Sequence, residues 1–172
     1  SHYSGLPPGA WRFTNNENGK PLIDPAAEPV SLSFSLAHTA GLAVVGVAKG
    51  IDIGVDVERA GRRVDAEGLS RRFFSPEEAA ALENLPPGRL EEQFPQYWTM
   101  KEAYIKARGL GLSLPLDGFG FELERGAIRL WTGPTPADDP STWQFWQMGF
   151  QRHFLAVAAR QPRSGDARLL VR

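Results

Sequence analysis

The chain has 172 residues, of which 42% are hydrophobic and 23% charged, and its formal net charge is −1. This is the composition of an ordinary globular domain, and the near-zero charge excludes a general attraction to nucleic acid or an anionic membrane. There is no cysteine, which excludes disulfides, thiolate metal sites and a cysteine nucleophile. No apolar run approaches the ~20 residues of a membrane span, and no signal peptide is visible. We therefore expect a cytoplasmic protein without nucleic-acid or membrane partners.

Turns and short strands are expected in the first fifty residues. Residues 1–29 are rich in Pro, Gly and Asn, with one short strand around Trp11 and Phe13. Residues 30–37 alternate apolar and small polar side chains, which is typical of a half-buried strand. Residues 42–47 form an apolar run, so the two segments are expected to pair as a hairpin.

Two helices are predicted in the centre of the chain. Ser75 is a suitable N-cap, and Glu78 completes a capping box at the start of a helix over residues 76–85. A second helix is expected over residues 96–108, ended by Gly109. More strands follow, at residues 119–123, 128–131, 144–146 and 153–159. Strands, helices and strands in this order predict an α+β fold with antiparallel sheet.

Residues 51–58 form the clearest strand, and it carries two acids on one face. Its isoleucines and valines fall on the opposite face from Asp56 and Glu58. Two adjacent carboxylates repel each other, and a cation, a protonated partner or solvent relieves the repulsion. Mg²⁺ prefers carboxylate oxygens and keeps substrate phosphates among its ligands. A solvated polar face is the alternative, and this strand alone favours it.

The second helix carries a third acid beside a lysine. Trp98, Glu102 and Lys106 follow one another at i, i+4 and i+8, so they share a stripe. The alternative is a surface ion pair between Glu102 and Lys106, worth only ~0.3–0.5 kcal/mol. The functional interpretation is a carboxylate that holds a metal next to an ammonium that meets phosphate.

Two upstream residues are weaker candidates for an anion site. Lys20 lies between Gly19 and Pro21 in a turn, and His38 follows the strand at residues 30–37. An ordinary surface lysine and a structural histidine are the alternatives, and the local spacing favours both of them.

Two sequence motifs in order resemble the signature of 4′-phosphopantetheinyl transferases, with the Sfp-type branch as the closer match. They are Gly-Val-Asp-Val-Glu at residues 54–58 and Trp-Thr-Met-Lys-Glu-Ala-Tyr-Ile-Lys-Ala at residues 98–107. Segments that fit the family's other motifs are Gly-Lys-Pro at 19–21, Leu-Ala-His-Thr at 36–39, Phe-Phe-Ser-Pro-Glu-Glu at 73–78 and Gly-Leu-Gly-Leu at 109–112. The similarity covers about residues 11–123.

This resemblance implies a fold of two similar halves, each with a small antiparallel sheet packed on helices. Residues 1–50 would be the remaining part of an incomplete N-terminal half, and residues 51–172 the C-terminal half with the metal-site motifs, together one functional domain. Sfp-type enzymes have further residues before the Gly-Lys-Pro motif. Three alternatives stay open: these residues are on another chain, they were removed, or the protein manages without them.

The resemblance also implies the reaction. The enzyme would move 4′-phosphopantetheine from coenzyme A, the co-substrate, to a serine of an acyl or peptidyl carrier protein. Asp56, Glu58 and Glu102 would hold Mg²⁺, with Mn²⁺ as an alternative since both accept oxygen ligands. Glu102 would help to deprotonate the serine, directly or through a water.

Basic residues would contact coenzyme A. The resemblance assigns this role to Lys20, His38, Lys101 and Lys106, and it makes His38 and Lys106 catalytic as well. Lys106 would stabilise the leaving 3′,5′-ADP. Ala37 stands where the family usually has Ser, so we expect one phosphate contact to be absent. A degenerate relative that binds coenzyme A or a carrier without turnover is the main alternative, and an unrelated Mg²⁺-dependent phosphohydrolase is the third interpretation.

Overall fold

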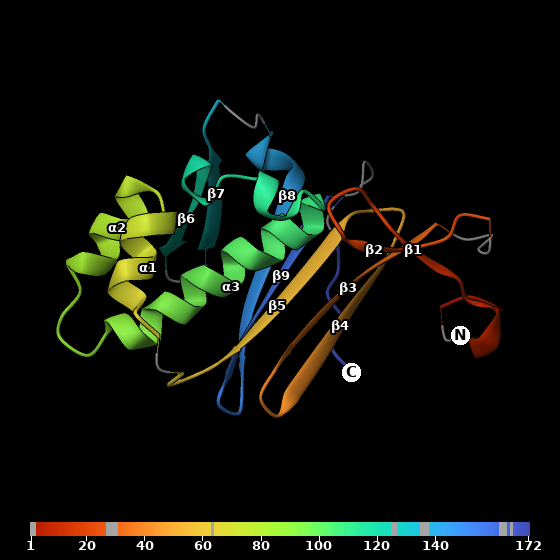
Figure 1. The fold of residues 1–172 in the computed structure, drawn as a ribbon, viewed down its shortest axis with the longest axis horizontal. Coiled ribbons are helices and arrows are strands. Elements are labelled where there is room, and N and C mark those ends of the chain that lie inside the picture. The colour runs from red at the N-terminus through yellow and green to blue at the C-terminus, as the bar shows by residue number, and fades with distance from the viewer. Residues whose placement is uncertain are drawn as a thin grey trace.

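Antiparallel strands and three helices make up the fold (Figure 1). The computed structural model describes residues 3–26, 31–62, 64–124, 127–134, 138–161, 165 and 167–172. The strands are β1 (Phe13–Asn15), β2 (Pro21–Ile23), β3 (Leu32–Thr39), β4 (Leu42–Lys49), β5 (Ile53–Arg59), β6 (Phe119–Glu124), β7 (Ala127–Thr132), β8 (Trp143–Phe150) and β9 (His153–Arg160). The helices are α1 (Ala66–Phe73), α2 (Pro76–Glu83) and α3 (Leu90–Arg108). The predicted α+β class is confirmed.

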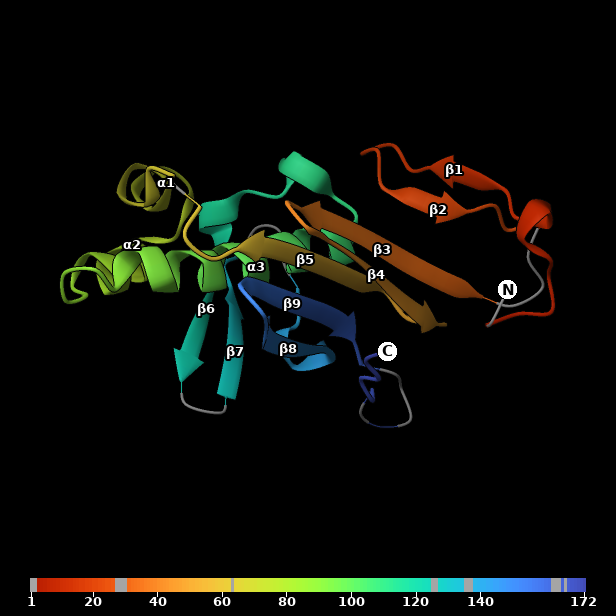
Figure 2. The same cartoon turned by 90° about the horizontal axis from the view of Figure 1, so that it is seen from below.

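A three-stranded antiparallel sheet, ordered β5-β9-β8, forms the centre. Helix α3 lies against one face, and the β3–β4 hairpin packs beside β5 on the other side (Figures 1 and 2). Ile53, Val55 and Val57 enter the core shared with that hairpin. The opposite face of β5, with Gly54 and Asp56, meets α3, as the alternation of side chains predicted.

Gly54 allows β5 to lie directly on α3. A Cβ atom at this position would be 1.9 Å from the carbonyl oxygen of Ala103 and 2.4 Å from the backbone nitrogen of Ala107. No side chain fits there without a shift of the backbone. This close contact sets how far the acids of β5 stand from those of α3.

We expect Gly54→Ala to lower the free energy of unfolding by ~1–3 kcal/mol, because an overpacked core has to shift. Urea denaturation measures this loss. Gly149→Ala in β8 is the matched control, since its Cβ would have no neighbour within 4 Å. Equal stability of the two variants would contradict the role given to Gly54.

The helices confirm most of the predicted signals. Ser75 Oγ accepts a hydrogen bond from the backbone nitrogen of Glu78 at 3.1 Å, and Glu78 Oε2 accepts one from the nitrogen of Ser75 at 3.2 Å, so the capping box forms. Gly109 ends α3 with φ 66°. Helix α1 was not predicted, although Asp65 is a recognisable N-cap that accepts from the nitrogen of Gly68.

Helix α3 begins at Leu90, six residues before the expected start, and runs through Pro95. Phe94 is buried in a cluster with Phe74 and Trp98, whose ring centroids lie 5.5 and 5.8 Å from its own. A proline inside a helix removes one backbone hydrogen bond and crowds the preceding turn, which costs stability. Burial of the neighbouring aromatic ring offsets part of this cost.

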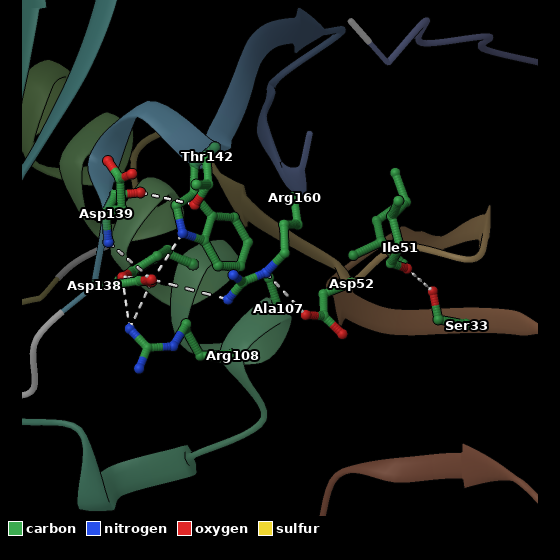
Figure 3. Close-up of polar contacts among 12 residues, drawn as sticks. Ser33, Ile51, Asp52, Ala107, Arg108, Asp138, Asp139, Thr142 and Arg160 are labelled. Carbon is green, nitrogen blue, oxygen red and sulfur yellow. Dashed lines mark hydrogen bonds and ion pairs between the residues drawn. The ribbon is translucent and has the colours of Figure 1, made fainter. Parts of the chain in front are cut away.

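Asp138 ties the segment before β8 to the end of α3 (Figure 3). Its Oδ2 accepts hydrogen bonds from Tyr104 Oη at 2.7 Å, Arg108 Nη1 at 2.7 Å and Trp143 Nε1 at 2.8 Å. Burial and this carboxylate raise the pKa of Tyr104 above its usual range. Asp52, the residue before β5, pairs with Arg160 at 3.2 Å, and Arg160 also lies 3.9 Å from Asp138.

Several expected boundaries lie outside the described residues. They include Val30, the turn at residues 125–126 and part of the segment after residue 160. Among the helices that are described, none is both long and apolar enough to cross a membrane.

Candidate functional site

Four predicted residues meet where β5 lies against α3. Asp56 and Glu58 come from β5, and Glu102 and Lys106 from the facing side of the helix. Lys106 Nζ lies 2.6 Å from Asp56 Oδ1. The alternative of a Glu102–Lys106 surface pair is therefore not what the structure has, because the lysine reaches across to the strand.

Burial and mutual repulsion act on these acids. The pKa of Asp56 is raised, first by burial, while Lys106 lowers it and Glu58 raises it further. The pKa of Glu102 is also raised, by burial first and then by Asp56, with Lys106 again opposing. Among the described residues, the three acids have only two cations as ion-pair partners, Lys106 and Arg62, so an added cation would be stabilised there.

Glu58 supplies the clearest sign of a ligand site. Its Oε1 accepts a hydrogen bond from Arg62 at 2.8 Å, but its Oε2 is buried without a partner among the described residues. Buried carboxylate oxygens are normally satisfied, so an orphan of this kind needs an explanation. Oxygen donors of this set fit Mg²⁺ or Mn²⁺. As they stand, however, no three His, Asp or Glu side chains in the described ranges are arranged to hold a metal ion.

A basic cleft of about 830 Å³ opens where β5 ends, directly after Glu58 in the sequence. Its charged lining comes from Arg59, Arg62 and Arg152, with His38 at the rim of β3, and backbone turns supply the rest. His38 is exposed to this space. We name this feature the arginine cleft.

Sequence reasoning found only His38 of this lining. Arg59 and Arg62 come directly after Glu58, and a positive pair beside the second acid was a signal that could have been used. Arg152 lies in the β8–β9 turn, where its carbonyl oxygen accepts from the nitrogen of Ala60 at 2.7 Å. Nothing in the local sequence links this turn to the site.

A smaller pocket of about 140 Å³ lies between α1 and α3. It shares Arg59 and Arg62 with the arginine cleft, and Glu58 lines this smaller pocket. Its other lining is mostly apolar and consists of Val64, Leu69, Phe94, Pro95 and Trp98. The polar cleft and the apolar pocket therefore adjoin the same two arginines, and one of these, Arg62, pairs with Glu58.

Lys20 is placed differently from the prediction. Its ammonium donates to the carbonyl oxygen of Ala107 at 3.0 Å and lies 3.4 Å from that of Ile53, so it caps the end of α3. Burial lowers the pKa of Lys20, with Asp52 opposing. The lysine fastens the N-terminal turn to the core, away from the arginine cleft.

Lys101 is not a coenzyme A contact in this structure, and that prediction was wrong. The side chain is fully buried, with its ammonium 2.6 Å from Glu78 Oε2. It also donates to the carbonyl oxygens of Leu116 at 2.7 Å and Phe119 at 2.6 Å. A lysine with three partners in the core has no donor left for a ligand.

The expectation for Ala37 also changes. Its side chain is buried in the core between β3 and β5, whereas the neighbouring His38 faces outward. Because successive side chains of a strand point to opposite faces, a hydroxyl at position 37 would not reach the arginine cleft. The absence of Ser at this position therefore costs no contact in the cleft.

Comparisons with known proteins agree with the two sequence motifs. Residues 52–158 match the family model described as the 4′-phosphopantetheinyl transferase superfamily. The 4′-phosphopantetheinyl transferase HetI of Nostoc sp. (strain PCC 7120 / SAG 25.82 / UTEX 2576) is 38% identical over 111 residues, which are 64% of this chain and 47% of that protein. The 4′-phosphopantetheinyl transferase Sfp of Bacillus subtilis (strain 168) is 34% identical over 114 residues, 66% of this chain and 48% of that one.

A longer stretch matches the 4′-phosphopantetheinyl transferase psf-1 of Bacillus pumilus, at 36% identity over 157 residues, 90% of this chain and 63% of that protein. The chain thus spans about half the length of most of these relatives. Among solved structures, the holo-[acyl-carrier-protein] synthase of Thermotoga maritima has a similar fold, with a TM-score of 0.53 at 21% identity over 66% of this chain and 65% of that one. The predicted resemblance is confirmed, and the chain belongs to the 4′-phosphopantetheinyl transferase superfamily.

Proposed function

We propose that this chain carries the site that transfers 4′-phosphopantetheine from coenzyme A to a serine of an acyl or peptidyl carrier protein, in an Mg²⁺-dependent reaction. The observation that carries the proposal is the meeting of Asp56, Glu58, Glu102 and Lys106, joined to a cleft lined by arginines through the Arg62–Glu58 pair. Acids alone would suit many cations. Acids next to a basic cleft suit a cation that is bound together with phosphates.

Asp56, Glu58 and Glu102 would hold the divalent cation. The unpartnered Oε2 of Glu58 and the raised pKa values of the other two acids support this assignment. The cation would neutralise charge on the diphosphate of coenzyme A. Lys106 holds Oδ1 of Asp56, so the cation would compete with the ammonium for this oxygen.

The chain's own residues would then act on the reacting atoms. Glu102, directly or through a water, accepts the proton of the serine hydroxyl. The serine oxygen forms a bond to the phosphorus next to pantetheine, and the bond from that phosphorus to 3′,5′-ADP breaks. Lys106, released from Asp56, stabilises the leaving phosphate oxygen. The protein positions and neutralises, as in other phosphoryl transfers.

The arginine cleft would bind the phosphates of the coenzyme. Arg59, Arg62 and Arg152 offer guanidinium groups, which bind phosphate oxygens in pairs of hydrogen bonds. His38 at the rim remains the predicted catalytic and coenzyme-contacting residue of β3. On the other side of Glu58, the apolar pocket with Val64 and Trp98 would accept an apolar side chain of the carrier protein.

We also propose that residues 1–50 are part of an N-terminal half and residues 51–172 form the C-terminal half. Supporting this, the outer face of the β3–β4 hairpin is apolar and exposed, with Leu36 opposite Val45. Phe13 of β1 continues this face and touches Phe34 edge-on at 5.6 Å. A further segment on another chain that covers this face is a candidate partner.

The test of the function is a transfer assay. The chain is incubated with Mg²⁺, coenzyme A and several apo carrier proteins, and intact-mass spectrometry looks for the added phosphopantetheine on the carrier serine. A mass gain that disappears with EDTA is expected. Binding of coenzyme A without any mass gain would instead favour the degenerate relative that binds without turnover.

We expect Arg152→Ala to weaken coenzyme A binding by about tenfold, because it removes one charge-assisted contact of the arginine cleft. Isothermal titration calorimetry in the presence of Mg²⁺ measures the dissociation constant. Arg129→Ala in β7 is the charge-matched control, since Arg129 is exposed on a strand outside the cleft. Equal affinity of both variants for coenzyme A would contradict its binding in the arginine cleft.

A further inference from the structure

The ammonium of Lys106 occupies the acid that the metal would need. Lys106 Nζ is 2.6 Å from Asp56 Oδ1, and the Asp56 side chain is only 11% exposed. Arg62 makes a similar contact to Glu58, but its side chain is 60% exposed and solvent screens the pair more strongly. Of the two cations on the acid cluster, Lys106 therefore holds its carboxylate more firmly.

Other carboxylate oxygens of the cluster have no cation paired with them in the described part of the chain. Glu58 Oε2 is buried without a hydrogen-bond partner, and no ion pair involves Glu102 among the described residues. One lysine thus stands in for part of the charge that a divalent cation would bring. It takes Oδ1 of Asp56, Arg62 takes Oε1 of Glu58, and Oε2 of Glu58 is left without a partner among the described residues.

We propose that Lys106 is a placeholder cation that competes with the divalent metal for Asp56 and leaves only when a phosphate offers it a new partner. This rests on the proposed function, and it adds a coupling between the two ligands. Metal alone has to displace an ammonium from Oδ1 of a largely buried carboxylate. When a phosphate donor binds together with the metal, the phosphate gives Lys106 a new partner and offsets the cost of this displacement.

The coupling has a use in the reaction. A site that binds metal weakly on its own is filled mainly when coenzyme A is present, so the acids are neutralised together with the diphosphate. By linkage, metal and coenzyme A raise each other's affinity by the same factor. Lys106 positions Asp56 before the ligands arrive and contacts the substrate afterwards.

The test measures Mn²⁺ alone, without coenzyme A or carrier protein. Free Mn²⁺ is followed by electron paramagnetic resonance during titration of the full chain. We expect Lys106→Met to bind Mn²⁺ at least about fivefold more tightly than the unaltered chain, since the competing charge is gone. Lys106→Arg keeps the charge and should stay near the unaltered affinity.

Lys49→Met is the charge-matched control. Lys49 is exposed at the end of β4 that pairs with Leu32, opposite the end near the arginine cleft. It reports the effect of one lost positive charge on the whole chain. Circular dichroism of all variants shows that the fold is kept.

The outcomes separate the two proposals. Equal Mn²⁺ affinity of Lys106→Met and Lys49→Met, or weaker binding by Lys106→Met, would overturn the placeholder role even if transfer occurs. Tighter binding by Lys106→Met supports it even if the transfer assay fails with every carrier. If none of these proteins binds Mn²⁺, the metal assignment and the inference both fall.

Discussion

Glu102→Gln is expected to lower the rate of phosphopantetheine transfer by at least ~100-fold while the metal-free protein keeps or gains stability. Even residues that only support metal ligands contribute ~10–100-fold. Glu102 is proposed both as a ligand and as the group that accepts the serine proton. Glutamine has nearly the same shape but carries no charge and is no base. Intact-mass kinetics with a carrier protein measure the rate.

The stability half of this prediction follows from the pKa shifts. In the folded, metal-free chain the pKa values of Asp56 and Glu102 are raised, by burial first. The folded state therefore binds protons more readily than the unfolded state, and this contribution to stability is full below the unfolded pKa values. It is lost as the pH rises through the raised folded values, so the charged form of the acid cluster destabilises the fold.

Removing one charge of the cluster should accordingly raise the melting temperature at pH 7 in EDTA, and the difference from the unaltered chain should shrink toward pH 4. Differential scanning calorimetry across this range measures it. Glu122→Gln on the exposed side of β6 removes the same charge elsewhere and serves as the control. Normal transfer by Glu102→Gln, or a lower melting temperature at pH 7, would contradict the site as described.

The largest stability loss is expected from Lys101→Met. Both side chains of the Lys101–Glu78 pair are buried, at 0% and 2% exposure, and the ammonium lies 2.6 Å from the carboxylate. Removing one partner leaves the other as an uncompensated buried charge, which costs ~3–5 kcal/mol. Glu78 also accepts from the nitrogen of Phe121 at 2.8 Å, so the disturbance reaches β6. Urea denaturation measures the free energy of unfolding.

A double variant tests the cause of this loss. In Lys101→Met with Glu78→Gln the buried charge is gone, yet an amide oxygen can still accept from Phe121. We expect the double variant to recover part of the stability that Lys101→Met loses. Unchanged stability of Lys101→Met together with weaker coenzyme A binding would restore the sequence-based assignment of Lys101 to the ligand.

The motif on helix α3 identified the family correctly but did not show that Lys101 faces the core. Consecutive residues of a helix point in directions about 100° apart, so Lys101 and Glu102 cannot share a surface. Side-chain directions on strand β5 were easier to predict, because side chains alternate between the two faces of a strand. Once the isoleucines and valines were placed in the core, the acids had to lie on the other face. The position of Lys20 could not be predicted, since a turn does not fix the direction of a long side chain and its partners lie more than thirty residues away in the sequence.

The sequence by itself determined the α+β class, the family, the capping box of α2, the end of α3 and the three acids with Lys106. These depend on local periodicity, on capping chemistry and on motif order. Only the tertiary structure decided that Lys106 pairs with Asp56, that Lys101 and Ala37 face the core, and that Arg152 joins Arg59 and Arg62 at one cleft. Those facts depend on which distant segments pack together, and here Gly54 lets β5 lie close enough to α3 for the acids to meet.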